Sequence, residues 1–265
     1  MVRTPISYYG GKQYITTWVL SNFPKNYHRM FYVEPFAGGL SVFFSKKPSE
    51  GETISDIDKD LFIFYKNLRD NPAELKRRIY ATLYSENEHT YAKKILKNKT
   101  NYSEMEIAWA TFLSINFSFS CMKNGSFGYS KGINCDGTTS PRTRVQKNKL
   151  LKFNWFSKRL KDCQIMNRPA LDMIKRFDSE DALFYLDPPY PETDQSYQHQ
   201  FTNNQWNEMI ECLKTIKGKF LLSFYLKDWM SFPAKWKIIQ KKSRNTTSIN
   251  KEDRTNRVES LIKNF

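Results

Sequence analysis

The sequence contains little of what metal or thiol chemistry requires. Its 265 residues include three isolated histidines and four cysteines, Cys121, Cys135, Cys163 and Cys212, none of them in a Cys-x-x-Cys pair. A zinc site or a cysteine–histidine nucleophile needs such residues at close spacing. We therefore expect no metal site, and we expect reduced, mostly buried thiols.

Long apolar runs and a leader are also missing. Residues 1–10 lack the apolar core of a signal peptide, and the longest apolar stretches, such as 220–226, are far too short to span a bilayer. We expect a soluble cytoplasmic protein, of a bacterium or a phage-infected cell, that makes no membrane contact.

Acidic residues are few relative to basic ones. There are 27 Asp and Glu against 42 Lys and Arg, which gives a net charge of +15. Residues 85–165 hold 14 basic and 6 acidic side chains, a balance of +8, and residues 227–265 hold 10 and 4, a balance of +6. Solubility alone would not require this sign, so the balance favours a polyanionic partner.

The order of expected elements indicates a doubly wound α/β sheet. Strands are predicted at 31–33, 53–55, 163–166, 182–186, 220–225, 236–240 and 258–265, and helices at 14–23, 40–44, 58–68, 170–177 and 205–215. Residues 72–160 interrupt this alternation with helices at 74–84 and 105–113 and a polar hairpin or loop at 123–140. We predict a catalytic domain formed by 1–70 and 161–265 and a mainly helical, basic insertion formed by 71–160.

The tetrapeptide Asp187-Pro188-Pro189-Tyr190 directly follows the apolar strand 182–186. The carboxylate of Asp187 and the carbonyl of Pro188 are two acceptors for the hydrogens of an exocyclic amine, and the proline rings fix their direction. Tyr190 offers a face on which a heterocycle can stack. A plain turn is the competing interpretation. The pattern favours capture of a flat, amino-bearing base.

Three further segments predict a ligand cleft at the carboxyl ends of the strands. Glu34-Pro35-Phe36-Ala37-Gly38-Gly39 stands where a Rossmann-like first turn belongs, but it lacks the Gly-x-Gly-x-x-Gly phosphate cradle, and Glu34 favours a positively charged ligand. Asp56 follows the second strand, where an acid typically receives ribose hydroxyls. Tyr8-Tyr9-Gly10-Gly11-Lys12 could fold over an adenosyl group and its carboxylate. Each segment taken alone is also compatible with an ordinary turn.

Taken together, these segments resemble the Dam-like N6-adenine DNA methyltransferases of the alpha arrangement. The resemblance rests on residues 8–12, 34–44, 55–65, 169–174 and 186–191, and on their order along the chain. It implies a Rossmann-like S-adenosylmethionine-dependent methyltransferase fold with Asp187, Pro188 and Tyr190 as catalytic residues. It also implies a cofactor pocket lined by Tyr8, Gly10, Gly11, Lys12, Glu34, Pro35, Phe36, Gly38, Ser41, Asp56, Asp172 and Asp187.

The insertion is expected to contact double-stranded DNA. The resemblance places a recognition hairpin at 116–131, where aromatic residues alternate with Asn, Ser and Lys. Lys93, Lys94, Lys97 and Lys99 either meet phosphates or form a solvated face. The candidate DNA-binding residues are Lys123, Asn124, Tyr129, Lys131, Arg142 and Arg144, with the two arginines as the best candidate base or phosphate readers.

The predicted reaction is transfer of a methyl group from S-adenosylmethionine to N6 of an adenine flipped out of a short duplex sequence. N4-cytosine methylation remains an alternative, as do methylation of RNA or of a protein amide and a DNA-binding protein without catalysis. We expect a monomer. A cognate restriction endonuclease is a candidate genetic partner, which the sequence leaves open.

Overall fold

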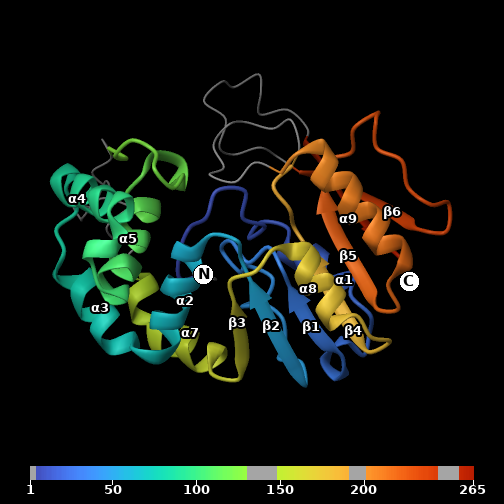
Figure 1. Ribbon diagram of the computed structural model, residues 1–265, viewed down its shortest axis with the longest axis horizontal. Helices are drawn as coiled ribbons and strands as arrows, with labels where there is room; N and C mark the ends of the chain where they lie inside the picture. The colour runs from blue at the N-terminus through green and yellow to red at the C-terminus, as the bar shows by residue number, and fades with distance from the viewer. Residues whose placement is uncertain (1–3, 130–147, 191–200, 244–256) are drawn as a thin grey trace, which may run out of the picture. The chain divides into compact units, whose positions relative to one another are not determined.

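The computed structural model describes residues 4–129, 148–190, 201–243 and 257–265 (Figure 1). The chain divides into two compact units. The first unit comprises Met1–Thr16, Ala37–Lys46 and Asp58–Asn167, and the second comprises Thr17–Phe36, Lys47–Ile57 and Arg168–Phe265. These boundaries differ from the predicted 71–160 insertion, because the N-terminal turn and the helix after the second strand belong to the first unit.

A seven-stranded mixed sheet confirms the predicted α/β fold. Its strands are β1 (Phe31–Glu34), β2 (Gly51–Ser55), β3 (Cys163–Met166), β4 (Ala182–Leu186), β5 (Lys219–Phe224), β6 (Lys237–Ser243) and β7 (Arg257–Lys263). Their order is β3-β2-β1-β4-β5-β7-β6. Strands β2, β1, β4 and β5 pair in parallel, whereas β7 runs antiparallel to both β5 and β6. The direction of winding therefore reverses between β1 and β4, which is where ligands bind in such sheets.

The helices of the second unit cover the sheet. Figure 1 shows α8 (Ala170–Phe177) and α9 (Asn203–Thr215) over the same face, and a short helix η1 (Tyr27–Arg29) precedes β1. The start of α9 is fixed by a capping box in which the side chains of Thr202 and Gln205 each accept a hydrogen bond from the other residue's backbone. Helix α1 (Thr16–Ser21) spans the boundary between the units. Strand β4 is wholly buried, as a parallel central strand should be.

The first unit is mainly helical. Its helices are α2 (Lys59–Asp70), α3 (Pro72–Ala81), α4 (Glu86–Lys97), η2 (Lys99–Asn101), α5 (Glu104–Asn116), η3 (Phe119–Cys121) and α7 (Phe153–Leu160). Helix α5 is buried continuously from Ile107 to Asn116. Helices α2, α3 and α4 pack around it. A helix enclosed in this way needs apolar residues on all sides, as α5 has.

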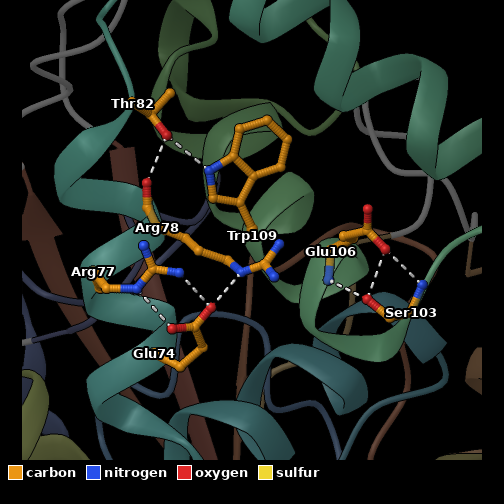
Figure 2. A network of polar contacts seen from close by, with 7 residues as sticks. All are labelled: Glu74, Arg77, Arg78, Thr82, Ser103, Glu106 and Trp109. Atoms are coloured by element: carbon orange, nitrogen blue, oxygen red, sulfur yellow. Dashed lines mark hydrogen bonds and ion pairs between the residues drawn. The ribbon is translucent and has the colours of Figure 1, made fainter.

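Polar contacts lie within α3 and between its end and α5 (Figure 2). Glu74 receives hydrogen bonds from the guanidinium groups of Arg77 and Arg78 on the same helix, at 2.7–2.9 Å. The indole of Trp109 on α5 donates to the hydroxyl of Thr82, the residue after α3, at 2.8 Å. This last contact joins the end of α3 to α5.

Two local predictions were wrong. Residues 41–45 form consecutive turns, and no regular helix begins at Leu40, because Leu40 has a left-handed φ of 54° that breaks the helical path. Cys163 is buried, but Cys121 and Cys212 are only half-buried. All three are free thiols, and Cys135 lies outside the described residues.

The structure has a hairpin at 117–128, inside the 116–131 segment where the resemblance places one and starting before the polar segment expected at 123–140. Ser118 and Phe127 form an antiparallel bridge, and Phe119 and Gly128 donate backbone hydrogen bonds to Ser126 and Phe117 at 2.8 and 2.7 Å. Of the predicted 123–140 segment, residues 130–140 lie outside the described part of the chain. None of the helices in the described ranges has both the length and the apolar character that a membrane span requires.

Candidate active site

Three predicted acids lie at the same edge of the sheet. Glu34 is the last residue of β1, Asp56 follows β2 and Asp187 follows β4. Because β1 pairs in parallel with both β2 and β4, the carboxyl ends of these strands meet at one edge. The second unit therefore brings together the acids that stood 22 and 131 residues apart in the sequence.

Glu34 is held in place from its own strand. Its side chain is buried, and Oε2 accepts a hydrogen bond of 2.5 Å from the hydroxyl of Tyr32. Residues two apart on a strand share a face, which explains the contact. Burial raises the pKa of Tyr32 well above its usual value, and the Glu34 carboxylate raises it further. The phenol therefore stays a donor and keeps the carboxylate in a fixed orientation.

The tetrapeptide follows the buried strand β4 and is itself only partly covered. Asp187, Pro189 and Tyr190 are half-buried, and Pro188 is buried. The Tyr190 hydroxyl lies 3.4 Å from Asp187 Oδ1 and 3.4 Å from the Ser223 hydroxyl, so both contacts are long for hydrogen bonds. Burial, and next the Asp187 carboxylate, raise the pKa of Tyr190 well above its usual value. Tyr190 thus offers an uncharged ring beside an acceptor.

Sequence reasoning missed two neighbours of Tyr190. Its ring meets that of Tyr225 edge to face, with centroids 4.5 Å apart. The Tyr225 hydroxyl donates a 2.7 Å hydrogen bond to Oε1 of Glu259, which is completely buried on β7. No local motif marks either residue, because their proximity depends on the pairing of β5 with β7.

In the first unit, the N-terminal turn and the glycine turn contact each other. The Tyr8 side chain lies against Gly38 and Gly39, where added Cβ atoms would stand 3.1 and 3.0 Å from it. Gly38 also has a φ of +43°, and its carbonyl accepts a 2.7 Å hydrogen bond from the hydroxyl of Tyr65. Side chains at these two positions would push Tyr8 away, so the chain requires glycine there.

Lys12 closes the N-terminal turn. Gly11 donates a backbone hydrogen bond to the Tyr8 carbonyl at 3.1 Å, and Gly10 has a φ of +74°. The ammonium of Lys12 is buried and donates to the Gly10 carbonyl at 3.2 Å. Ser41, another predicted cofactor residue, is buried in the same unit. Asp172, by contrast, is exposed in the first turn of α8 in the second unit.

Lys123 has a different environment from the one expected of a DNA contact. Its side chain is 6% exposed, and its ammonium lies 2.5 Å from Asp58 Oδ2 and 2.7 Å from Asp60 Oδ2. Asp58 is also the N-cap of α2, where it accepts from the backbone of Asp60 at 2.9 Å. Lys99 adds a second ion pair to Asp60 at 2.5 Å. These pairs argue against phosphate contact by Lys123 and give it a role in fixing the start of α2.

Another lysine of the insertion also binds within the protein. Lys93 donates to the backbone carbonyls of Asn124 and Gly125, at 3.0 and 3.2 Å, and so holds the 117–128 hairpin against α4. Lys94 and Lys97 are exposed on α4. Phosphate contact and a solvated face therefore remain the two alternatives for Lys94 and Lys97.

The remaining predicted DNA-binding residues divide into two groups. Asn124 and Tyr129 are exposed, Asn124 has a left-handed φ of 69°, and Tyr129 donates to Glu86 at 2.9 Å. Lys131, Arg142 and Arg144 lie outside the described residues. The DNA role of all five stays a prediction.

A buried lysine that the sequence did not indicate links three distant segments of the first unit. Lys149 donates to the hydroxyl of Ser7 at 2.6 Å and to the side-chain oxygen of Asn116. The same oxygen accepts from the Ser7 backbone at 3.1 Å. Burial lowers the pKa of Lys149 to about 7. Ser7 directly precedes Tyr8, so this contact fixes the N-terminal turn to the end of α5.

Comparison with known proteins finds similarity to proteins named as methyltransferases or methylases. A 66-residue segment is 33% identical to the type II methyltransferase M1.LlaDCHI of Lactococcus lactis subsp. cremoris, and covers 25% of this chain but only 22% of that protein. Among solved structures, the putative methyltransferase yhhF of Escherichia coli is similar at a TM-score of 0.37 and 9% identity, over 95% of this chain and 82% of its own. A putative methylase of Haemophilus influenzae is similar at a TM-score of 0.36 and 13% identity, over 96% of both chains.

Nearly the whole chain matches one protein family. The match runs from residue 8 to residue 260, and so includes the N-terminal turn, the glycine turn, the tetrapeptide and β7 as far as Ser260. The chain belongs to the family of D12 class N6 adenine-specific DNA methyltransferases.

Proposed function

We propose that this protein transfers a methyl group from S-adenosylmethionine to N6 of an adenine in double-stranded DNA. The observation that carries the proposal is the position of Asp187-Pro188-Pro189-Tyr190 at the carboxyl end of β4. This is the strand next to β1 and Glu34, where the winding of the sheet reverses. Membership of the D12 class supports the same reaction.

The chemistry of the described residues fits the proposed cofactor. S-adenosylmethionine supplies a methyl group on a positively charged sulfonium and also carries an ammonium. Glu34 and Asp187 provide carboxylates at neighbouring strand ends, and Asp56 offers an acceptor for ribose hydroxyls. In the first unit, Tyr8 packs closely on Gly38, which belongs to the turn that follows β1 in the sequence.

Asp187 and Pro188 would receive the target amine. An adenine N6 has two hydrogens, and the Asp187 carboxylate and the Pro188 carbonyl are acceptors fixed by the proline rings. Hydrogen bonds to both hydrogens would orient the nitrogen lone pair and raise its electron density, so orientation and electrostatics both contribute to the rate. Methyl transfer would form the bond from N6 to the methyl carbon as the bond from that carbon to sulfur breaks. S-adenosylhomocysteine would leave, the surplus N6 proton would pass to solvent, and no covalent enzyme intermediate is required.

The base has to leave the duplex to reach these groups. Tyr190 offers an uncharged ring for the flipped adenine to stack on, because its raised pKa keeps the phenol protonated. DNA contact is assigned to the exposed residues Asn124, Tyr129, Lys94 and Lys97, together with the arginines at 142 and 144. We expect the protein to act as a monomer, and the type II relative makes a cognate restriction endonuclease a candidate partner.

Methyl transfer from labelled S-adenosylmethionine to unmethylated genomic DNA, followed by nucleoside analysis, tests the proposal. N6-methyladenine in the product is the expected result, and sequencing its context would give the recognition site. N4-methylcytosine would contradict the base assignment. Label in RNA or protein, with none in DNA, would contradict the substrate.

The two arginines can be tested in the same assay. If Arg142 or Arg144 reads a base edge, its replacement by alanine should relax the sequence preference of methylation. If both bind phosphate only, the double variant should weaken binding to all sequences alike and reduce the salt dependence of binding.

A further inference from the structure

The reversed strand β7 brings its beginning to the edge of the sheet that holds the catalytic tetrapeptide. Strands β4 and β5 run in parallel, with Leu186 beside Leu222, so their carboxyl ends lie at one edge. Strand β7 pairs with β5 in the opposite direction, with Phe224 beside Ser260. Its early residues therefore reach the edge where β5 ends, and the next pair in this register is Tyr225 with Glu259.

Glu259 is an unusual residue for this place. Its neighbours on β7, Ser260, Leu261 and Ile262, are buried as completely as it is. An apolar side chain would satisfy the sheet, whereas a carboxylate removed from water requires hydrogen-bond donors. The hydroxyl of Tyr225 is one such donor, at 2.7 Å. Residues that break the local rule of burial concentrate at functional sites.

Tyr225 connects this carboxylate to the tetrapeptide. Ser223 and Tyr225 are two residues apart, and as the strand extends they project from the same face of the sheet. Both contact Tyr190: the Ser223 hydroxyl lies 3.4 Å from the Tyr190 hydroxyl, and the two tyrosine rings meet at 65° with centroids 4.5 Å apart. The end of β5 therefore forms the support on which the Tyr190 ring rests.

We propose that Glu259 is a positioning residue for Tyr190 and acts through the hydrogen bond from Tyr225. With its hydroxyl held by Glu259, the Tyr225 ring keeps its position against Tyr190 and supports the Tyr190 ring that receives the flipped base. The inference rests on the proposed function, because it assigns Glu259 and Tyr225 to the same base-binding site.

Four variants separate this role from a merely structural one. Tyr225→Phe keeps the ring and removes the hydroxyl, and Glu259→Leu removes the acceptor. Glu259→Gln keeps an acceptor oxygen without the charge. Tyr80→Phe is the matched control, since the side chain of Tyr80 on α3 is 71% exposed. Each protein is assayed for kcat and for the KM of unmethylated genomic DNA, with its melting temperature measured in parallel.

We expect Tyr225→Phe and Glu259→Leu each to lower kcat about tenfold, because small misplacement of a positioned group costs up to about 100-fold. The KM for DNA should stay within about threefold, and the double variant should lose no more than either single variant, as groups acting in one chain are not additive. Glu259→Gln should restore most of the activity, and Tyr80→Phe should equal the wild type.

The double variant Tyr225→Phe/Glu259→Leu removes the hydroxyl and the carboxylate together, so neither group is left in the core without the other. It therefore replaces any single variant that fails to fold. A kcat within twofold of the wild type in this double variant would overturn the inference. Equal loss in Glu259→Gln and Glu259→Leu would also overturn it, because the charge and not the hydrogen bond would then matter. A wild-type protein that transfers no methyl group to DNA would instead contradict the proposed function.

Discussion

In the second unit, Glu34, Asp56 and Asp187 stand at the ends of parallel strands, whereas in the first unit Lys123 and Lys149 lie inside the protein. Both sets are charged residues. The sequence alone does not show whether each side chain is buried or what it contacts. The acids stand at strand ends, at the edge of a parallel sheet where ligands bind. The lysines lie in or beside helical segments, where a long side chain can reach inward to a carboxylate or an amide. Net charge therefore overstates the cationic surface available to a polyanion.

The largest effect should follow replacement of Asp187 by alanine. This removes an acceptor for the target amine, and loss of one such electrostatic group lowers turnover by about 100-fold or more. Methyl transfer to unmethylated DNA measures the effect. Asp162→Ala, at an exposed position in the first unit, should retain normal turnover. Normal turnover of the Asp187 variant would show that the strand-end acids are not the reactive set.

Replacing Lys123 by methionine should destabilise the first unit. Asp58 and Asp60 would lose the cation between them, and removing one partner of a buried ion pair costs about 3–5 kcal/mol. Unfolding in urea measures the loss, with Lys97→Met on the exposed face of α4 as the matched control. Weaker DNA binding by Lys123→Met at unchanged stability would instead restore the predicted phosphate contact.

Lys149 should make stability depend on pH. Its pKa is about 7 in the folded protein and near 10.5 when unperturbed, so the unfolded chain binds more protons between these values. The free energy of unfolding should therefore rise with pH across this window, by at most about 1.4 kcal/mol per pH unit from this group. Comparing urea unfolding of the wild type and Lys149→Met at pH 7, 8.5 and 10 isolates the contribution. Parallel pH profiles for the two proteins would mean that Lys149 is already fully protonated in the fold.

The smallest effect is expected at the exposed network around Glu74 (Figure 2). Hydrogen bonds from Arg77 and Arg78 lower the pKa of Glu74 to about 2. A lowered carboxylate pKa stabilises the fold at neutral pH, and this contribution is lost as the pH falls from above 4 toward 2. Because the groups are exposed, Glu74→Gln should lower the melting temperature only slightly, and added salt should reduce the difference. A large, salt-independent drop would place this network among the buried ones.

Regular elements with strong apolar patterns were predictable from the sequence. The helix at 170–177 and the strand at 182–186 were predicted with the bounds that the structure has. The turns that replace the helix expected at 40–44 were not predictable in this way, because Leu40 takes a left-handed conformation and Phe44 is buried against Trp155 and Phe156, which are far away in the sequence. Tyr225 and Glu259 were missed for a related reason, since only the register of β5 with β7 brings them together.

Local sequence patterns predicted which residues carry the chemistry, and their roles stay a prediction. These patterns are local: an acid at the end of a strand, two prolines and two paired glycines. They can be recognised in a sequence without knowledge of the fold. The tertiary structure was needed to show which charged groups pair inside the protein, as Lys123 does with Asp58 and Asp60. A long lysine side chain can extend into solvent or into the protein. Lys123 extends toward Asp58, which is 65 residues away in the sequence.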